Sequence, residues 1–128
     1  MIVDSSFLVP FFIEEHEFNK RALQEIKKHI GEQLVVLDRV LEETFTVITY
    51  KKGIAYALDV LEQLEENKDV IIFRLDGEDF YSIIELIRDL KTKLSFVDYA
   101  VLHLSISRKE MLLCFDEQLL ASFKKQMG

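Results

Sequence analysis

Four short apolar runs, separated by longer helical stretches, constrain the fold of this chain most. The runs are rich in β-branched or aromatic residues, which is typical of buried strands, and they occupy residues 1–3, 34–37, 70–73 and 111–115. The stretches between them repeat apolar side chains at helical spacing: Ala22, Ile26 and Ile30; Leu58, Leu61 and Leu64; Ile83, Ile84, Ile87 and Leu90. Parallel strands need crossover connections and are covered on both faces, so the alternation predicts an α/β fold. We expect three layers, α/β/α, around a central parallel sheet of four to five strands.

The length and composition predict a single domain over residues 1–128. The chain has 128 residues, of which 49% are hydrophobic, enough for one sizeable core. With four glycines and one proline, it has little material for linkers. The first residues lack the basic leader of a signal peptide, no window reaches the roughly 20 apolar residues of a membrane helix, and Cys114 is the only cysteine. We therefore expect a cytoplasmic protein without a membrane segment or an intramolecular disulfide.

The net charge of −7 by itself argues against binding to a phosphate backbone. That argument weakens if several acids converge on divalent cations, because their negative charge is then locally cancelled. The dibasic pairs would remain free to contact a nucleic acid, although scattered pairs of this kind are usually solvated surface. They are Lys20-Arg21, Lys27-Lys28, Lys51-Lys52, Arg108-Lys109 and Lys124-Lys125.

Four acids are placed to meet at one edge of the predicted sheet. Asp4 and Asp116 directly follow the first and last strands, and Glu43 follows the second strand by about one helical turn. Asp98 begins the helix that leads into the last strand, among apolar neighbours. Sites in open parallel sheets collect beyond the carboxyl ends of the strands. The pattern therefore predicts that the four carboxylates share a pocket.

Each acid also has a plain structural interpretation, because carboxylates are favoured at helix N-termini. In that interpretation Asp4 and Asp116 cap the first and last helices, and Asp38 caps the helix that carries Glu43. Ser95 and Asp98 fit a capping box. For any one acid, capping is the simpler explanation; the gathering of four at one end favours a cation, since clustered carboxylates repel one another.

An all-oxygen site favours a hard ion, Mg²⁺ or Mn²⁺, and no Cys/His spacing suited to zinc accompanies the acids. His16, His29 and His103 are dispersed, which indicates surface or helix-packing roles, and Cys114 reads as a buried strand residue. A carboxylate-held metal pair activates a bound water and stabilises an in-line phosphodiester displacement. The chain has no G-x-G-x-x-G motif and no P-loop, which argues against a nucleotide-cofactor enzyme.

The segments around these acids resemble, in order, the four motifs of PIN domains. Residues 2–6, Ile-Val-Asp-Ser-Ser, are similar to the first motif, and residues 40–43 to the second, where Glu43 rather than Glu42 is the match. Residues 94–100 and 113–119 are similar to the third and fourth. Each motif alone is weak, but four in order along the whole chain form a fairly specific signal.

The resemblance implies a Mg²⁺- or Mn²⁺-dependent endoribonuclease that acts on RNA and usually forms a homodimer. It assigns Asp4, Glu43, Asp98 and Asp116 to the metal site, with Ser6 as a supporting hydroxyl. Many relatives of this size are toxins of VapBC-type pairs, neutralised by a small antitoxin whose tail lies across a groove near the first helices. Such an apolar surface, unless it belongs to the core or to a dimer interface, could be formed here by Phe7, Phe11, Phe12 and Phe18.

Two positions depart from the family pattern. Cys114 stands where relatives usually carry Thr or Ser, and Gln118 stands where many carry a further acid. These departures motivate an alternative: a catalytically weak or inactive PIN domain that binds RNA or protein without cutting. A further alternative is an RNA-processing or quality-control nuclease rather than a toxin.

Overall fold

The computed structural model describes residues 1–128 as four strands and seven helices. The strands are β1 (Ile2–Val3), β2 (Leu34–Leu37), β3 (Val70–Phe73) and β4 (Leu112–Leu113). The helices are α1 (Ser5–Phe12), α2 (Asn19–Lys27), α3 (Asp38–Lys52), α4 (Ile54–Glu66), α5 (Gly77–Leu90), α6 (Phe96–Arg108) and α7 (Glu117–Met127).

The strands form one parallel sheet in the order β3-β2-β1-β4. Ile2 of β1 pairs with Val35 on one side and with Leu112 on the other. The chain moves from β1 through β2 to β3 in one direction and then crosses back to place β4 on the far side of β1. The strand order therefore reverses at β1 and β4, and ligands of open α/β sheets bind beside such a reversal.

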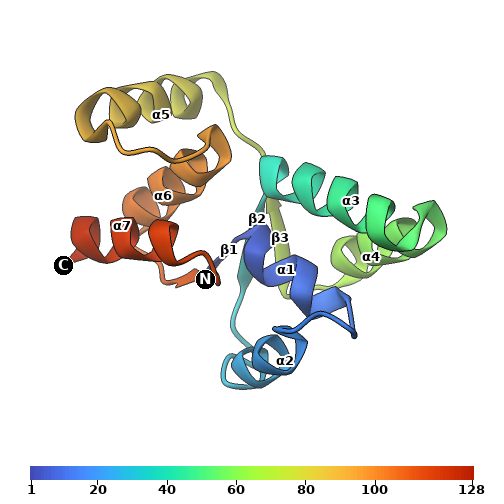
Figure 1. The fold of residues 1–128 in the computed structure, drawn as a ribbon. Helices are drawn as coiled ribbons and strands as arrows, with labels where there is room; N and C mark the ends of the chain where they lie inside the picture. The colour runs from blue at the N-terminus through green and yellow to red at the C-terminus, as the bar shows by residue number, and fades with distance from the viewer.

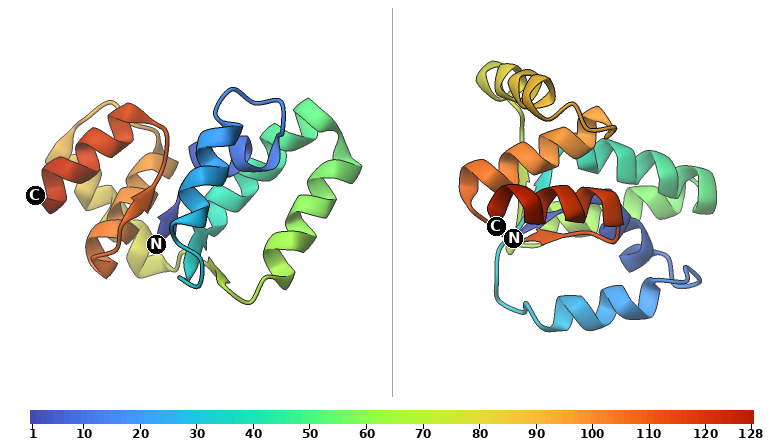
Figure 2. Two further views of the ribbon diagram at one scale, coloured as in Figure 1. Left: turned by 90° about the horizontal axis from the view of Figure 1, so that it is seen from below. Right: turned by 60° about the vertical axis from the view of Figure 1, so that its left-hand side comes forward.

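Helices cover both faces of the sheet. In Figure 1 and in the left view of Figure 2, α5, α6 and α7 gather on one side, and α1 to α4 lie on the other. The predicted three-layer α/β/α fold with a central parallel sheet is confirmed, with four strands. The four predicted apolar runs all contain a strand, although the first and last are only two residues long.

Burial follows the predicted helical pattern in part. Ile83 of α5 is fully buried. The prediction for α4 was wrong in part: Leu64 is buried as predicted, but Leu58 is 50% exposed, and Ala57 and Val60 complete the buried face. Ile30 lies beyond the end of α2 and is 82% exposed, because the chain turns toward β2 before the helical row can continue.

Asp38 does not cap α3 in the predicted way. The helix begins at Asp38 itself, and its N-cap residue is Leu37, which offers no side-chain hydrogen bond. The Asp38 carboxylate instead accepts hydrogen bonds from the backbone N–H of Arg39 at 2.8 Å and of Leu75 at 3.3 Å. It thereby joins the start of α3 to the segment that follows β3.

No helix combines the length and the hydrophobicity needed to cross a membrane.

Candidate metal centre

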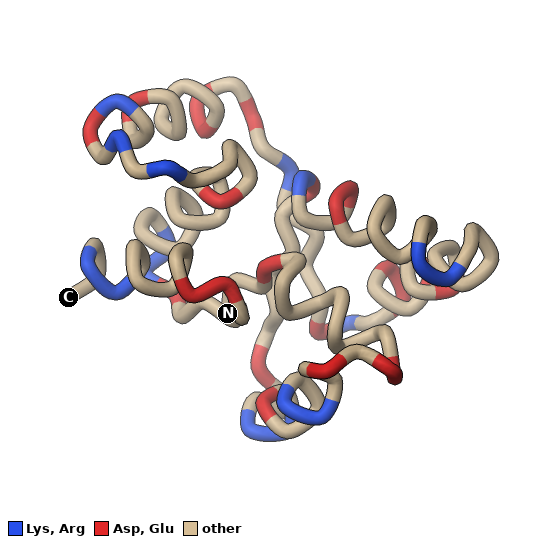
Figure 3. The backbone as a smooth tube through the Cα atoms, in the orientation of Figure 1, with Lys and Arg blue, Asp and Glu red and all other residues tan.

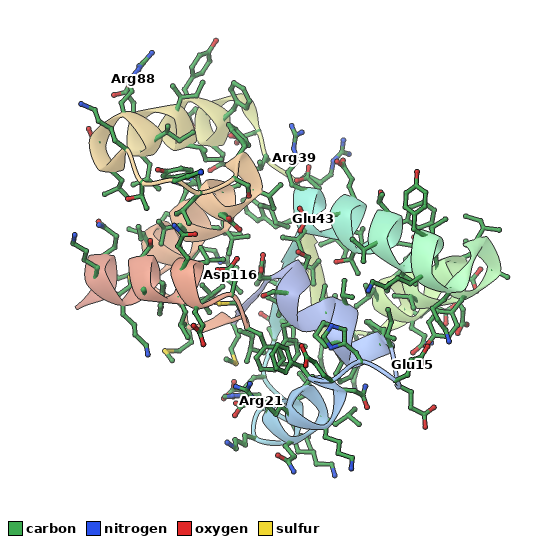
Figure 4. All side chains as sticks on the ribbon, viewed as in Figure 1. Glu15, Arg21, Arg39, Glu43, Arg88 and Asp116 are labelled. Atoms are coloured by element: carbon green, nitrogen blue, oxygen red, sulfur yellow. The ribbon has the colours of Figure 1, made fainter.

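A pocket of about 500 Å³ lies at the carboxyl edge of the sheet, beside the reversal between β1 and β4. All four predicted acids line it, and they come from different elements. Figure 4 shows Glu43 on α3 and Asp116 at the start of α7, on either side of this edge. The complete lining is Asp4, Ser5, Ser6, Val9, Pro10, His16, Glu17, Phe18, Glu43, Val47, Lys51, Asp98, Phe115 and Asp116.

Asp4 is the most deeply placed of the acids, with 3% of its surface exposed. It is the N-cap of α1, and its Oδ2 accepts a hydrogen bond from the Ser6 backbone N–H at 3.1 Å. Its Oδ1 is buried without any hydrogen-bond partner. Burial raises the pKa of the Asp4 carboxyl, and the nearby charges of Asp98 and Glu43 raise it further.

Asp98 and Asp116 are each held by hydrogen bonds at the start of a helix. Asp98 forms a capping box with Ser95: its Oδ2 accepts from the Ser95 N–H at 3.1 Å, and the Ser95 hydroxyl accepts from the Asp98 N–H at 3.1 Å. Asp116 is the N-cap of α7, and its Oδ1 accepts from the Leu119 N–H at 3.0 Å. The capping interpretation is therefore correct for these acids and for Asp4.

Two adjacent serines tie the pocket together. The Ser5 hydroxyl donates to Oε1 of Glu43, a contact that joins α1 to α3. The Ser6 hydroxyl accepts a hydrogen bond from the Phe115 backbone N–H at 2.9 Å, which joins the exit of β1 to the exit of β4. The sequence identified only Ser6 as a supporting hydroxyl and missed Ser5. The two neighbouring hydroxyls after the strand were the available signal.

The four acids share one hydrogen-bonding pattern. The protein holds a single oxygen of each carboxylate, and the other oxygen has no protein partner: Oδ1 of Asp4 and Asp98, Oδ2 of Asp116 and Oε2 of Glu43. Capping and cation binding therefore do not exclude each other. The capping hydrogen bond orients the carboxylate through one oxygen, and the second oxygen stays free for a cation.

The residues fit a hard divalent cation by their chemistry, although the acids are not drawn tightly together. No three Asp, Glu, His or Cys side chains lie close enough to hold one ion between them. The donors are nonetheless all carboxylate oxygens, which Mg²⁺ and Mn²⁺ prefer. A buried carboxylate oxygen without a partner, such as Oδ1 of Asp4, is costly unless a cation or a proton compensates it.

His16 and Lys51 also line this pocket, and the sequence reasoning assigned neither to it. Nδ1 of His16 accepts a hydrogen bond from the Phe18 backbone N–H at 3.0 Å, so in the neutral ring Nε2 carries the proton. His103 contacts Asp79 at 3.1 Å between α6 and α5, in agreement with a helix-packing role. Helical spacing from Glu43 could have indicated Lys51, which lies two turns further along α3.

Cys114 is buried, as the sequence predicted, but it lies just beyond β4 rather than within the strand. Its thiol donates to the Asp116 backbone carbonyl oxygen at an Sγ–O distance of 3.6 Å. Burial raises the pKa of the thiol to about 12, and the neighbouring carboxylates, Asp4 first, add to that effect. The side chain is therefore a neutral thiol near neutral pH. Gln118 is exposed on α7 and does not line the pocket.

The prediction that the dibasic pairs remain free was wrong for three of them, because one residue of each forms an ion pair. Lys28 pairs with Glu25, Lys52 with Glu15 at 2.6 Å, and Arg108 with Glu110. Lys51 has no ion pair, in contrast to its neighbour Lys52.

A second cavity of about 500 Å³ is mostly apolar and lies among α1, α2, α4 and the strands. Phe7, Phe11 and Phe12 line it, as expected for an apolar surface near the first helices. Phe18 does not: it lines the acidic pocket instead and packs against Phe115, with ring centroids 5.4 Å apart. The remaining lining residues are Val3, Leu8, Ile26, Leu34, Gln63, Leu64, Glu66, Asn67 and Val70.

The parallel sheet and the carboxylate-lined pocket beside the reversal of strand order place this protein among α/β domains with an acidic site. Within that class, the family model of the PIN domain matches residues 1–125, and the chain therefore belongs to the PIN domain family. Its fold is similar to the crystal structure of Mycobacterium tuberculosis VapC20, a Sarcin-Ricin loop cleaving toxin. That match has a TM-score of 0.83 and 19% identity, and it covers 94% of this chain and 93% of VapC20. No curated protein matches the sequence.

Proposed function

We propose that this chain is a single-domain, Mg²⁺- or Mn²⁺-dependent endoribonuclease, with Asp4, Glu43, Asp98 and Asp116 as the metal-binding acids. The proposal rests on the shared pattern of these carboxylates: all four line one pocket, and each keeps one oxygen without a protein partner. When bound there, a divalent ion would stabilise the charge that develops on a phosphodiester during in-line displacement.

The residues around the acids would position them for this reaction. Ser5 holds Glu43 toward the pocket, and the Ser6 hydroxyl ties the end of β1 to the end of β4 through the backbone N–H of Phe115. Fixed carboxylates need little reorganisation when the substrate arrives, and this is a general source of catalytic power. Cys114, whose thiol is directed at a backbone carbonyl, would take no part in the chemistry.

The likeness to VapC20 supports a VapC-type toxin as the biological role, with RNA as the substrate and a small antitoxin as the partner. The apolar cavity is the surface that we assign to the antitoxin, because an apolar groove beside two helices suits the apolar face of a peptide segment. The homodimer and the cytoplasmic location stay predictions, and light scattering of the purified protein would test the former.

The decisive test is cleavage of a mixed RNA substrate with Mg²⁺ or Mn²⁺, compared with an EDTA control and with Asp98→Asn. Asparagine keeps the oxygen that accepts from the Ser95 N–H, so the capping box persists while the carboxylate charge is lost. Asp116→Asn and its exposed neighbour Glu117→Gln form a matched pair, because Glu117 does not line the pocket. We expect cleavage to need metal, to fail in both aspartate variants and to persist in Glu117→Gln.

A non-cutting PIN domain is the second candidate, and the separation of the acids favours it, since no three of them lie within reach of one ion. This candidate predicts RNA or protein binding without metal-stimulated cleavage. Cleavage that persists in EDTA, or that is equal in Asp98→Asn and the parent protein, would contradict the nuclease assignment and indicate a contaminating enzyme.

A further inference from the structure

The groove beside α3 carries two unpaired cations on either side of Glu43. Arg39 and Lys51 form no ion pair, so both charges are available to an anion that enters the groove. Lys51 lines the acidic pocket, and Arg39 lines an adjoining cavity of about 320 Å³. The two cavities share Glu43 and Val47, so they form one continuous depression along the helix.

The spacing along α3 explains this arrangement. Arg39, Glu43, Val47 and Lys51 follow one another at intervals of four residues, and side chains at that interval are neighbours on a helix surface. With a rise of 1.5 Å per residue, the row is about 18 Å long, with Arg39 about 6 Å and Lys51 about 12 Å from Glu43 along the axis. Figure 3 shows this distribution on α3, with basic residues at both ends and acidic residues near its start.

We infer that this row is the track of the RNA backbone, with Arg39 and Lys51 binding phosphates on opposite sides of the bond that is cut. The inference rests on the proposed nuclease function and adds the direction in which the strand lies. The four acids at this edge would repel a polyanion wherever no cation offsets them. Lys51 is the only lysine or arginine that lines the acidic pocket, and Arg39 is the only one that lines the adjoining cavity.

An RNA strand is favoured over an acidic protein segment by the position of Glu43. A strand bound by both cations must pass over the carboxylate that the proposed function assigns to the metal site, which would bring a phosphodiester to the acids. An acidic peptide along the same row would place carboxylates there instead, with no reacting bond.

The test compares two adjacent lysines. Lys51 and Lys52 are neighbours on α3, but Lys52 pairs with Glu15, lies over the ring of Tyr56 and lines neither cavity. Lys51→Ala and Lys52→Ala therefore change the net charge equally, and alanine suits a helix interior. Arg88→Ala on α5, where Arg88 pairs with Glu85, is the corresponding control for Arg39→Ala.

The measurement is the salt dependence of binding to a fluorescent ten-nucleotide oligouridylate in Mg²⁺, by anisotropy. All proteins carry Asp98→Asn, so that the strand stays intact. Each lost phosphate contact lowers the slope of log Kd against log salt by about 0.7 for a single strand. We expect that decrease in Lys51→Ala and in Arg39→Ala, about 1.4 in the double variant, and unchanged slopes in Lys52→Ala and Arg88→Ala.

Equal slopes for the Lys51 and Lys52 variants would overturn the inference, even if the wild-type enzyme cleaves RNA. Binding of a polyglutamate peptide with the same slopes, without RNA binding, would assign the row to a protein partner and also overturn it. If the wild-type protein does not cleave RNA but the salt slopes of the variants are as expected, the nuclease assignment alone would be contradicted.

Discussion

Two cavities of about the same volume lie on opposite faces of helix α1 and differ completely in chemistry. Nine of the 12 residues that line one are hydrophobic, against four of the 14 that line the other. From α1, the acidic pocket receives Ser5, Ser6, Val9 and Pro10, and the apolar cavity receives Phe7, Leu8, Phe11 and Phe12. At 100° per residue these two sets point in opposite directions. A single eight-residue helix thus separates a candidate site for chemistry from a candidate site for a partner.

This difference predicts that substitutions can separate the two proposed functions, although both candidate sites share α1. Polar side chains on one face of α1 orient the acids, whereas its other face supplies rings that pack on one another. Phe11 lies edge-on to Phe12 with centroids 4.9 Å apart, and about 6.1 Å from Phe7. A change on either face should therefore affect mainly the cavity that this face lines.

The largest expected effect would come from Asp4→Asn, which should lower metal-dependent RNA cleavage by at least about 100-fold. Residues that only support metal ligands already cost about 10- to 100-fold when they are lost, and Asp4 is assigned as a ligand. Phe12→Ala, on the opposite face of α1, should leave the cleavage rate within about twofold. Initial rates at saturating Mn²⁺ measure both. Equal losses in the two variants would show that the faces are not separable.

The next effect concerns the partner. Phe12→Ala should weaken binding of a co-purifying small antitoxin by about 30-fold, the effect of removing a central aromatic contact worth about 2 kcal/mol. Phe80→Ala on α5 is the control, because Phe80 lines neither cavity and is partly exposed. Titration by calorimetry distinguishes the two variants. Unchanged affinity in Phe12→Ala would remove the apolar cavity as the antitoxin site.

A smaller effect is expected on stability, and its sign is opposite to that on activity. Burial raises the pKa of Asp4, so the folded state binds the proton more tightly than the unfolded state does. Stability is therefore highest below the ordinary carboxyl pKa and falls as the pH rises through the raised value. In EDTA near pH 7, Asp4→Asn should gain about 1.5 kcal/mol, the order of the cost of one unsatisfied buried group.

This gain should shrink as the pH is lowered through the raised pKa of Asp4, because the carboxyl of the parent protein then becomes protonated. Urea unfolding at several pH values, with parent and variant side by side, gives the difference in the free energy of unfolding. A gain that does not change with pH would show that the carboxylate is not strained by burial. Added Mn²⁺ should stabilise only the parent protein.

The smallest expected effect is that of Ser6→Ala, about 1 kcal/mol of stability, because the Phe115 N–H loses its acceptor. Ser122→Ala on α7, where the side chain has no hydrogen bond in the structure, is the matched control. Thermal unfolding measures both. Cleavage by Ser6→Ala should fall several-fold while metal affinity stays close to the parent value; an unchanged rate would reduce Ser6 to a purely structural role.

Much of the fold could be predicted from the sequence because strand composition and helix capping are local signals. Runs such as Val35-Val36-Leu37 predict a buried strand from their own composition, and Ser95 with Asp98 predicts a helix start from their own spacing. The errors lie where local spacing cannot decide. Leu58 has the right period for a core face, but the packing of α4 on its neighbours selected Ala57, Val60 and Leu64.

The sequence by itself determined the α/β class, the order of the strands and helices along the chain, and the four acids after strands or at helix starts. Only the tertiary structure decided that these acids line a single pocket with one oxygen of each left free. It also placed the Ser5 hydroxyl against Glu43, 38 residues away, and left Lys51 unpaired while Lys52 found Glu15. Periodicity and capping are short-range properties of the chain, whereas these contacts depend on strand order and helix packing, which bring distant residues together.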